Sequence, residues 1–270
     1  MKTVTFIAAL FCTPAFASNY QRVVLISFDG LSAKAFEGDK FLPEIFREGF
    51  YTRARTTNPP CTLSSHASML SCVPPEIHSI TWNSYKPERG TIKVPTLFEI
   101  LHNNGWRTVA IIGKEKLRQL LPKQYVDRIY ETGYRVEALE TAGNELENSR
   151  VFLFIHIAQA DNAGHAWGWG SAEYKKQVEI NSGLLRALLW QYVYDPGTLM
   201  IVTSDHGGQY NVHPSQCQEC FIIPIAVKGK GVPNLKIVDG NASTVDTSLT
   251  IMRLLGLKPP STCTGEPLWH

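Results

Sequence analysis

Beyond its first residues, the chain has no long hydrophobic run. No later stretch approaches the about 18 consecutive apolar residues that a membrane-spanning helix needs. The chain also lacks a basic run or an interleaving of basic and aromatic residues, and its formal net charge is only +2. Internal repeats, low-complexity segments and linkers are absent too. The sequence therefore predicts a single domain over residues 18–270, with neither a membrane span nor a groove for nucleic acid.

Residues 1–17 have the features of a secretory signal peptide. Lys2 gives a basic start, Val4–Phe11 is apolar but too short to span a membrane, and Ala15-Phe16-Ala17 is a small-x-small cleavage site. We therefore expect an exported protein, periplasmic or secreted. An odd number of cysteines remains after cleavage, so at least one is expected to stay unpaired within the chain.

The cysteines give little support for a structural zinc site. Cys217-Gln-Glu-Cys220 is half a zinc knuckle, but no second pair at matching spacing follows, so a disulfide or free thiols are expected. Cys61 and Cys72 bracket a predicted helix about 16 Å long at 1.5 Å per residue, and should not pair with each other.

Apolar runs alternate with segments of helical periodicity along the chain. Strands are predicted at Arg22–Phe28, Tyr51–Arg55, Thr108–Ile112, Val151–Ile157, Thr198–Val202 and Phe221–Val227. Helices are predicted from near Leu63 and at Val94–Asn103, Val136–Glu147, Ala172–Gln191 and Thr247–Leu255. This alternation predicts an α/β fold with a mainly parallel central sheet that is sandwiched by helices.

Two segments that follow predicted strands are rich in carboxylate and imidazole groups. They are Asp161-Asn-Ala-Gly-His165 and Ser204-Asp205-His206-Gly-Gly, with His213 shortly after. Such groups are costly to bury unless something pairs with them, and they are the usual ligands of zinc and related metals. Five are too many for one structural site. The pattern therefore indicates a bimetallic hydrolytic centre.

A third carboxylate ends the first predicted strand, at Asp29. In open α/β sheets, ligands bind beyond the carboxyl ends of the strands. We therefore expect Asp29, Asp161 and Asp205 to converge on one edge of the sheet. Each of them alone would be read as a helix cap or turn residue, but the three together are hard to explain in that way.

A hydroxyl at the start of the helix near Leu63 is a candidate nucleophile. Thr62 stands where backbone N–H groups and the helix dipole suit a phosphate. Thr62 is equally a typical N-cap, and Ser64 or Ser65 would also serve as the nucleophile. The residues alone leave this choice open.

The ordered set resembles the alkaline phosphatase superfamily, specifically its type I phosphodiesterase/nucleotide pyrophosphatase branch. The segments that carry the resemblance are Ser27-Phe-Asp29-Gly30, Thr62 before His66, Pro75-Glu-Ile-His78 with Asn83, Asp161 with His165, and Asp205-His206 with His213. Their joint order and spacing are more specific than any single motif, and they run over essentially the whole mature chain. The resemblance implies an alkaline phosphatase-like three-layer fold.

The resemblance also implies roles. It assigns one divalent metal ion, most readily zinc, to Asp161, His165 and His213, and a second to Asp29, Asp205 and His206. Thr62 would contact the second metal ion and attack phosphorus, forming a covalent phosphothreonine. Asn83 would donate to a phosphoryl oxygen of the bound substrate. Manganese or iron also suit such ligands.

The chain departs from the family pattern at Ser79, which replaces the usual glycine after His78 and bears on the turn that aims Asn83. The segment from Gly113 to Lys116 resembles one in phosphonoacetate hydrolase and in single-chain phosphate monoesterases, where cations touch the substrate. Lys114 is therefore a candidate substrate-binding residue. The alternative is a solvated helix start.

Other polar and aromatic residues have simpler interpretations. His66 and His156 are expected to be hydrogen-bonded interior residues rather than metal ligands. Trp167 and Trp169 either pack on the core or line a substrate wall.

These features predict an exported two-metal hydrolase of small phosphate esters or anhydrides. The enzymatic alternative is a phosphomonoesterase, phosphonate hydrolase or sulfatase with the same metal centre. The alternative without catalysis is a metal-stabilised binding protein. Few residues are left between the motifs for large caps, so an open, permissive site is expected.

Overall fold

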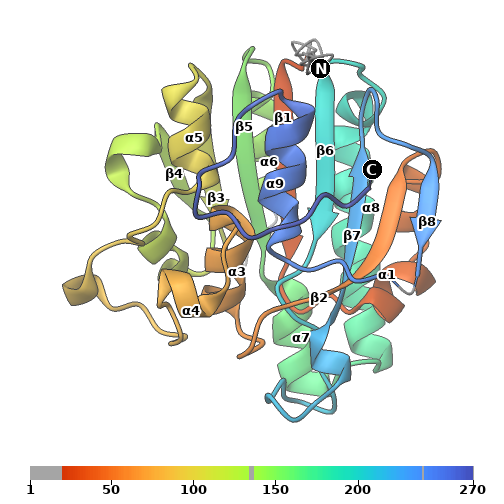
Figure 1. The fold of residues 1–270 in the computed structure, drawn as a ribbon. Helices are drawn as coiled ribbons and strands as arrows, with labels where there is room; N and C mark the ends of the chain where they lie inside the picture. Colours follow the sequence, from red (N-terminus) through yellow and green to blue (C-terminus); the bar gives the residue numbers. More distant parts are fainter. Residues whose placement is uncertain (1–19, 134–136, 239, 270) are drawn as a thin grey trace, which may run out of the picture.

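The computed structural model describes residues 20–133, 137–238 and 240–269. Their strands form an eight-stranded sheet in the order β4-β3-β5-β1-β6-β7-β2-β8 (Figure 1). The strands are β1 (Arg22–Phe28), β2 (Phe50–Arg55), β3 (Arg107–Ile112), β4 (Arg128–Glu131), β5 (Val151–Ile157), β6 (Thr198–Thr203), β7 (Ile222–Lys228) and β8 (Leu235–Ile237). The predicted signal peptide, residues 1–17, lies outside the described residues.

The α-helices connect these strands. They are α1 (Ala33–Gly38), α2 (Leu42–Ile45), α3 (Thr62–Ser71), α4 (Pro75–His78), α5 (Leu97–Asn103), α6 (Glu137–Glu145), α7 (Gln159–Trp167), α8 (Ala172–Val193) and α9 (Asp246–Leu254). A short 3₁₀ helix, η2 (Glu115–Leu120), follows β3. Among the described helices, none has both the length and the apolar character needed to cross a membrane.

The predicted α/β fold with a mainly parallel sheet is confirmed. The strands from β4 to β6 all run parallel, and β1 pairs along its length with β5 on one side and β6 on the other. These central strands are continuous apolar runs because both faces of a covered parallel sheet are buried. The strand β7 departs from the pattern, because it runs antiparallel to both β6 and β2.

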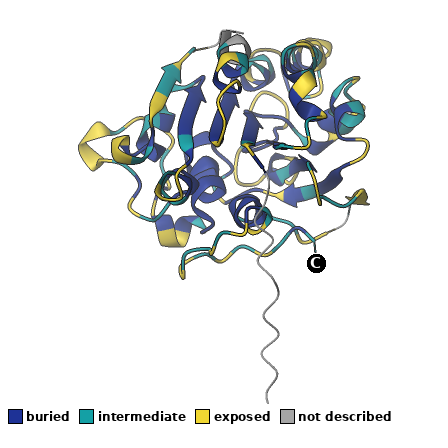
Figure 2. Ribbon diagram, turned by 90° about the horizontal axis from the view of Figure 1, so that it is seen from above, coloured by how far each residue is buried: buried dark blue, intermediate teal, exposed yellow. Residues whose placement is uncertain are grey.

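Helices cover both faces of the sheet, and each face has its own apolar cluster. One cluster includes Leu63 of α3, Leu97 of α5 and Ile251 of α9. The other includes Tyr174 and Leu185 of α8, together with residues of α1 and α2. Figure 1 shows α3, α5 and α9 in front of the strands and α8 behind them, and Figure 2 shows the strands buried between the layers.

Within the described residues two disulfides form, and Cys61 is buried as a free cysteine. Cys217 pairs with Cys220 across the loop between β6 and β7. Cys72, directly after α3, pairs with Cys263 in the C-terminal segment. Cys61 and Cys72 therefore stay apart, as the length of the intervening helix predicted.

Ser79 adopts the left-handed conformation (φ 62°) that a glycine would take without cost. The departure from the family pattern therefore leaves the turn itself in place, at the expense of backbone strain in a non-glycine residue. We expect Ser79→Gly to stabilise the protein by about 0.5–1 kcal/mol, since relief of about 1–2 kcal/mol of strain exceeds the added chain entropy of glycine. Urea unfolding measures this change.

Ser79→Ala is the matched control for this prediction, because it removes the exposed hydroxyl and keeps the strain. It should leave the free energy of unfolding within about 0.5 kcal/mol of wild type. A Ser79→Gly variant that is less stable than Ser79→Ala would contradict the argument.

Candidate metal centre

Four neighbouring parallel strands place the candidate residues at one edge of the sheet. In spatial order, β3 is followed by Lys114, β5 by α7 with Asp161, β1 by Asp29 and β6 by Asp205. The carboxyl ends of parallel strands share one edge, which is why residues so distant in the sequence meet there. The expected convergence of Asp29, Asp161 and Asp205 is observed.

Each of the three carboxylates has one oxygen held by the protein and one left over. Asp29 Oδ2 lies 2.6 Å from Lys114 Nζ, which also donates to Asp161 Oδ2 at 2.6 Å. Asp205 Oδ1 accepts hydrogen bonds from the backbone N–H groups of Gly30 and His206, both at 3.0 Å. The opposite oxygens, namely Asp29 Oδ1, Asp161 Oδ1 and Asp205 Oδ2, are buried without a hydrogen-bond partner.

These three oxygens surround Nε2 of His206, which also has no hydrogen-bond partner. It lies 3.5 Å from Asp29 Oδ1, 3.8 Å from Asp161 Oδ1 and 3.5 Å from Asp205 Oδ2. Unpaired acceptors of this kind are costly to bury, and here they point at one another. Three carboxylates against the one ammonium of Lys114 also leave an excess of buried negative charge. The donor set therefore fits divalent cations.

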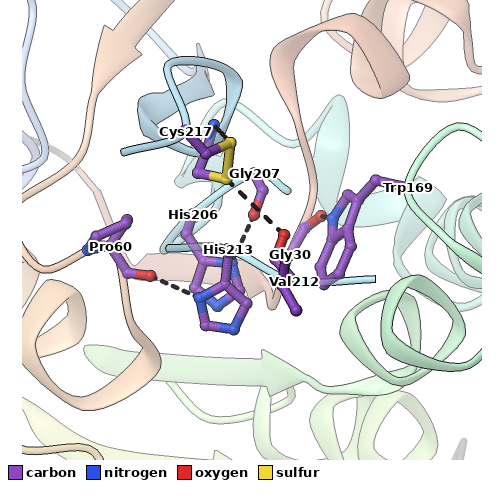
Figure 3. Close-up of a disulfide and its surroundings, with 9 residues drawn as sticks. Gly30, Pro60, Trp169, His206, Gly207, Val212, His213 and Cys217 are labelled. Atoms are coloured by element: carbon purple, nitrogen blue, oxygen red, sulfur yellow. Dashed lines mark hydrogen bonds between the residues drawn. A yellow bond between two sulfur atoms is a disulfide. The ribbon is translucent and has the colours of Figure 1, made fainter. Parts of the chain in front are cut away.

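The candidate histidines are held with Nε2 free. His206 Nδ1 donates to the Gly207 carbonyl, His213 Nδ1 to that of Pro60, and His165 Nδ1 to that of Asn211, each at 2.8 Å (Figure 3 shows the first two). A carbonyl only accepts, so the proton lies on Nδ1 and the lone pair on Nε2. Such a contact on the far nitrogen is typical of metal-binding histidines.

Among the described residues, two groups of side chains bring their potential ligand atoms within 4.8 Å of one another. One group is Asp29, Asp205 and His206, and the other is Asp161, His206 and His213. The first is the set that the resemblance assigned to one metal ion. In the second, His206 stands where the resemblance placed His165. The His165 side chain lies on the exposed side, with Nε2 3.4 Å from Asp161 Oδ1. The ligand roles themselves stay predictions.

The electrostatics of the carboxylates follow from these contacts. Burial alone would raise the pKa of Asp29, but the Lys114 ammonium and the His156 hydrogen bond hold that pKa well below its usual value. Burial and the nearby charge of Asp29 raise the pKa of Asp161. Lys114 is thus not a solvated helix residue, since its side chain is only 10% exposed and forms ion pairs with two of these carboxylates.

Thr62 is placed for contact with this centre rather than for capping its own helix. Cys61 holds the N-cap position of α3, and Thr62 is the first helical residue, 1% exposed. Its Oγ1 lies 3.5 Å from Asp29 Oδ2. Ser65 Oγ hydrogen-bonds the hydroxyls of Thr56 and Thr57 instead, and Ser64 Oγ is buried without a partner. The geometry therefore favours Thr62 over the two serines.

Asn83 lies at the N-terminus of α3, with a lysine that the sequence argument did not single out. Asn83 Oδ1 accepts hydrogen bonds from Leu63 N and from Lys116 Nζ, both at 3.1 Å. A backbone N–H only donates, so the oxygen of the amide is fixed and its Nδ2 hydrogens remain for another partner. Burial and the charge of Lys114 lower the pKa of Lys116. Lys114 precedes the short η2 segment and Lys116 lies within it. The spacing of the two lysines shows no helical periodicity that would have identified Lys116 from the sequence.

His156 also belongs to this site, although it was expected only as an interior residue. Gly113 N–H donates to its Nδ1 at 3.2 Å, so the proton lies on Nε2, which donates to Asp29 Oδ2 at 2.9 Å. His66, in contrast, uses both nitrogens elsewhere, since Nδ1 donates to the Thr62 carbonyl at 2.7 Å and Nε2 accepts from Ser27 Oγ at 2.8 Å. His156 thus orients the Asp29 carboxylate.

We expect His156→Leu to lower kcat/KM about 10- to 100-fold, the usual effect of removing a group that orients a metal ligand. His156→Gln is the matched control, because its amide nitrogen can still donate to Asp29, and it should stay within a few-fold of wild type. The measurement is hydrolysis of a chromogenic phosphate ester. Equal losses in the two variants would show that the hydrogen bond to Asp29 is unimportant.

Comparisons with known proteins agree with this architecture. The profile of the family "Type I phosphodiesterase / nucleotide pyrophosphatase" matches residues 23–138. Over 104 residues, 37% of this chain, the sequence is 29% identical to GPI ethanolamine phosphate transferase 1 of Aspergillus fumigatus. The match covers 10% of that protein, and the chain spans about a third or less of the length of the curated relatives it matches.

Solved structures share the fold at low identity. Murine ectonucleotide pyrophosphatase/phosphodiesterase 5, solved as an inactive form with AMP, superimposes with a TM-score of 0.75 at 12% identity, covering 91% of this chain and 97% of its own. An alkaline phosphatase superfamily protein from Vibrio parahaemolyticus gives 0.69 at 18% identity, covering 93% and 72%. The family profile over residues 23–138 agrees with the predicted resemblance, and the solved structures show that the chain has an alkaline phosphatase-like fold.

Proposed function

We propose that this protein hydrolyses small phosphate esters or anhydrides with Thr62 as the nucleophile and two divalent metal ions, most readily zinc. The observation that carries the proposal is the contact of the Thr62 hydroxyl with Asp29, whose other oxygen belongs to a cluster of unpaired ligand atoms. The metal-stabilised binding protein considered from the sequence has no need for a hydroxyl at this position.

The chain supplies a complete set of groups for phosphoryl transfer. Bound metal ions would contribute positive charge that lowers the pKa of the Thr62 hydroxyl and offsets charge on the leaving oxygen. Thr62 Oγ1 forms a bond to phosphorus as the bond to the leaving oxygen breaks, and water then hydrolyses the phosphothreonine. The N-terminal N–H groups of α3 and Nδ2 of Asn83 bind the phosphoryl oxygens of the substrate. His156 keeps Asp29 oriented throughout.

A specific observation favours a monoester or phosphonate substrate over a diester. Two ammonium groups, Lys114 and Lys116, lie at the site, one between two carboxylates and one on Asn83. The Lys116 ammonium stands beside the residue that is proposed to bind the phosphoryl group, so it would add a contact to the second charge of a dianion. A diester carries only one charge on its phosphorus group.

Rates on mono- and bis-(4-nitrophenyl) phosphate, with zinc present, test both parts of the proposal. Hydrolysis of either substrate supports the hydrolase, and hydrolysis of neither overturns it. A monoester rate well above the diester rate supports the dianion preference. Lys116→Met should then lower the ratio of the two rates about tenfold, because a charge-assisted contact is worth about 1.5–3 kcal/mol. An unchanged ratio would assign Lys116 to positioning Asn83 alone.

We further propose that the protein is exported. The proposal rests on the basic start, apolar stretch and cleavage site of residues 1–17, and it agrees with the two disulfides. Mass determination of the protein from the medium or periplasm tests it, and an N-terminus after Ala17 is the expected result.

A further inference from the structure

The indole of Trp169 lies against all three candidate histidine ligands. Its ring centroid is 5.1 Å from that of His165, 5.9 Å from that of His213 and 6.4 Å from that of His206. The first two contacts are edge-to-face, the favourable arrangement for aromatic rings. Trp169 is thus half-buried under the histidines, while Trp167 is 63% exposed. Trp169 packs against the core, which is one of the two positions considered for it from the sequence.

Two glycines of the metal motifs make room for this indole. A Cβ on Gly164, in the segment between Asp161 and His165, would stand 2.6 Å from Trp169 Cε2. A Cβ on Gly208, in the segment after His206, would come closer still to the same ring. Neither glycine has a positive φ. Their absence of a side chain is therefore explained by the close approach of the ring rather than by backbone conformation.

Hydrogen bonds fix the indole from two sides. Trp169 Nε1 donates to the carbonyl oxygen of Gly30, directly after Asp29, at 2.8 Å (Figure 3). Trp169 N donates to the carbonyl oxygen of Tyr210 at 2.7 Å. Through its ring and its backbone N–H, Trp169 thereby connects the segment after β1 and the loop that carries His213 with the end of α7. These are the three segments that supply the candidate metal ligands.

We propose that Trp169 is a positioning residue that fixes the candidate histidine ligands relative to Asp29. The indole packs edge-to-face against His165 and His213, whose own rings lie 5.1 Å apart, and its hydrogen bond to Gly30 ties these rings to the segment after Asp29. The inference rests on the metal centre of the proposed function. It assigns Trp169 no contact with the substrate and no part in the chemical step.

Zinc affinity of the whole protein, measured by competition with a chromophoric chelator, is the first test. Trp169→Leu should weaken zinc binding about 10- to 100-fold, as loss of a group supporting metal ligands does. Trp190→Leu is the matched control, because Trp190 is also half-buried but contacts Arg186 of α8 and Tyr194 directly after that helix. It should lower the melting temperature and leave zinc affinity within twofold of wild type.

A double-mutant cycle separates positioning from general damage to the fold. Gly208→Ala should weaken zinc binding about tenfold or more in the wild-type background, because the new methyl group displaces the indole. In the Trp169→Leu background the same change should cost less than twofold, since the ring it displaces is gone. Additive losses would show that Gly208 and Trp169 act independently, which would overturn the inference.

The change in tryptophan fluorescence when zinc is added provides a measurement that a loss of stability alone does not alter. Added zinc should change the tryptophan emission of wild type and of Trp190→Phe, and should not change that of Trp169→Phe. Unaltered zinc affinity together with a retained emission change in Trp169→Phe would overturn the inference and leave the proposed hydrolase intact. A wild-type protein that binds no zinc would overturn the metal centre and this inference together.

Discussion

Replacement of Thr62 by alanine is expected to lower kcat for phosphate-ester hydrolysis at least about 10³-fold. The hydroxyl is the one group at the start of α3 that lies near a candidate ligand carboxylate, so its removal leaves the substrate without the attacking oxygen. Initial rates with a 4-nitrophenyl ester measure the loss. KM should change much less, because the α3 N–H groups and Asn83 remain in the variant.

Two further variants make the result specific. Ser64→Ala removes a neighbouring buried hydroxyl and should keep activity within a few-fold of wild type. Thr62→Ser retains an oxygen at the same position and should keep a substantial part of the activity. A Thr62→Ala protein with wild-type kcat would assign the attack on phosphorus to water or to another group.

Removal of divalent metal ions is expected to abolish hydrolysis and to lower the melting temperature. Without cations, the three buried carboxylates of Asp29, Asp161 and Asp205 outnumber the ammonium groups of Lys114 and Lys116 that offset their charge. Zinc at about a thousand times its dissociation constant adds about 4 kcal/mol for each site it fills. At roughly 2–4 °C per kcal/mol for a chain of this size, one filled site raises the melting temperature by about 10 °C.

Calorimetry of the protein with chelator and with zinc measures this shift. Asp205→Asn should lose much of it, because Asp205 Oδ2 is one of the unpaired oxygens. Asp195→Asn is the control, since Asp195 precedes β6 and pairs with Arg22 at the start of β1, at the opposite ends of these strands from the metal centre. It should lower both melting temperatures and keep their difference. Full activity in chelator would contradict the prediction.

The sequence predicted the central strands and the residues at their carboxyl ends, because both signals are local. Apolar runs such as Val151–Ile157 are long enough to identify as strands, and a carboxylate directly after one is placed by the strand itself. The direction of β7 was beyond this reasoning, since a buried strand has the same apolar composition in parallel and antiparallel pairs.

The supporting groups could not be predicted because they depend on tertiary neighbours. The contact of His156 with Asp29 depends on the pairing of β1 with β5, in which Phe28 lies opposite Ile157. Lys114 meets two carboxylates only because β3 lies next to β5. The sequence analysis did not predict the helix α7. The i, i+4 spacing of Asp161 and His165, which is that of a single helix face, was the signal that could have identified this helix.

The bond between Cys72 and Cys263 bears on how these measurements are made. It spans 191 residues and joins the end of the helix that starts with Thr62 to the C-terminal segment. In the chain-entropy description, a closed loop of this size is worth about 5 kcal/mol, comparable to the whole stability of many domains. Thiol reductants would cut this bond and would also bind zinc themselves. Oxidised protein in thiol-free buffer is therefore the preparation in which metal affinity and fold stability can be measured separately.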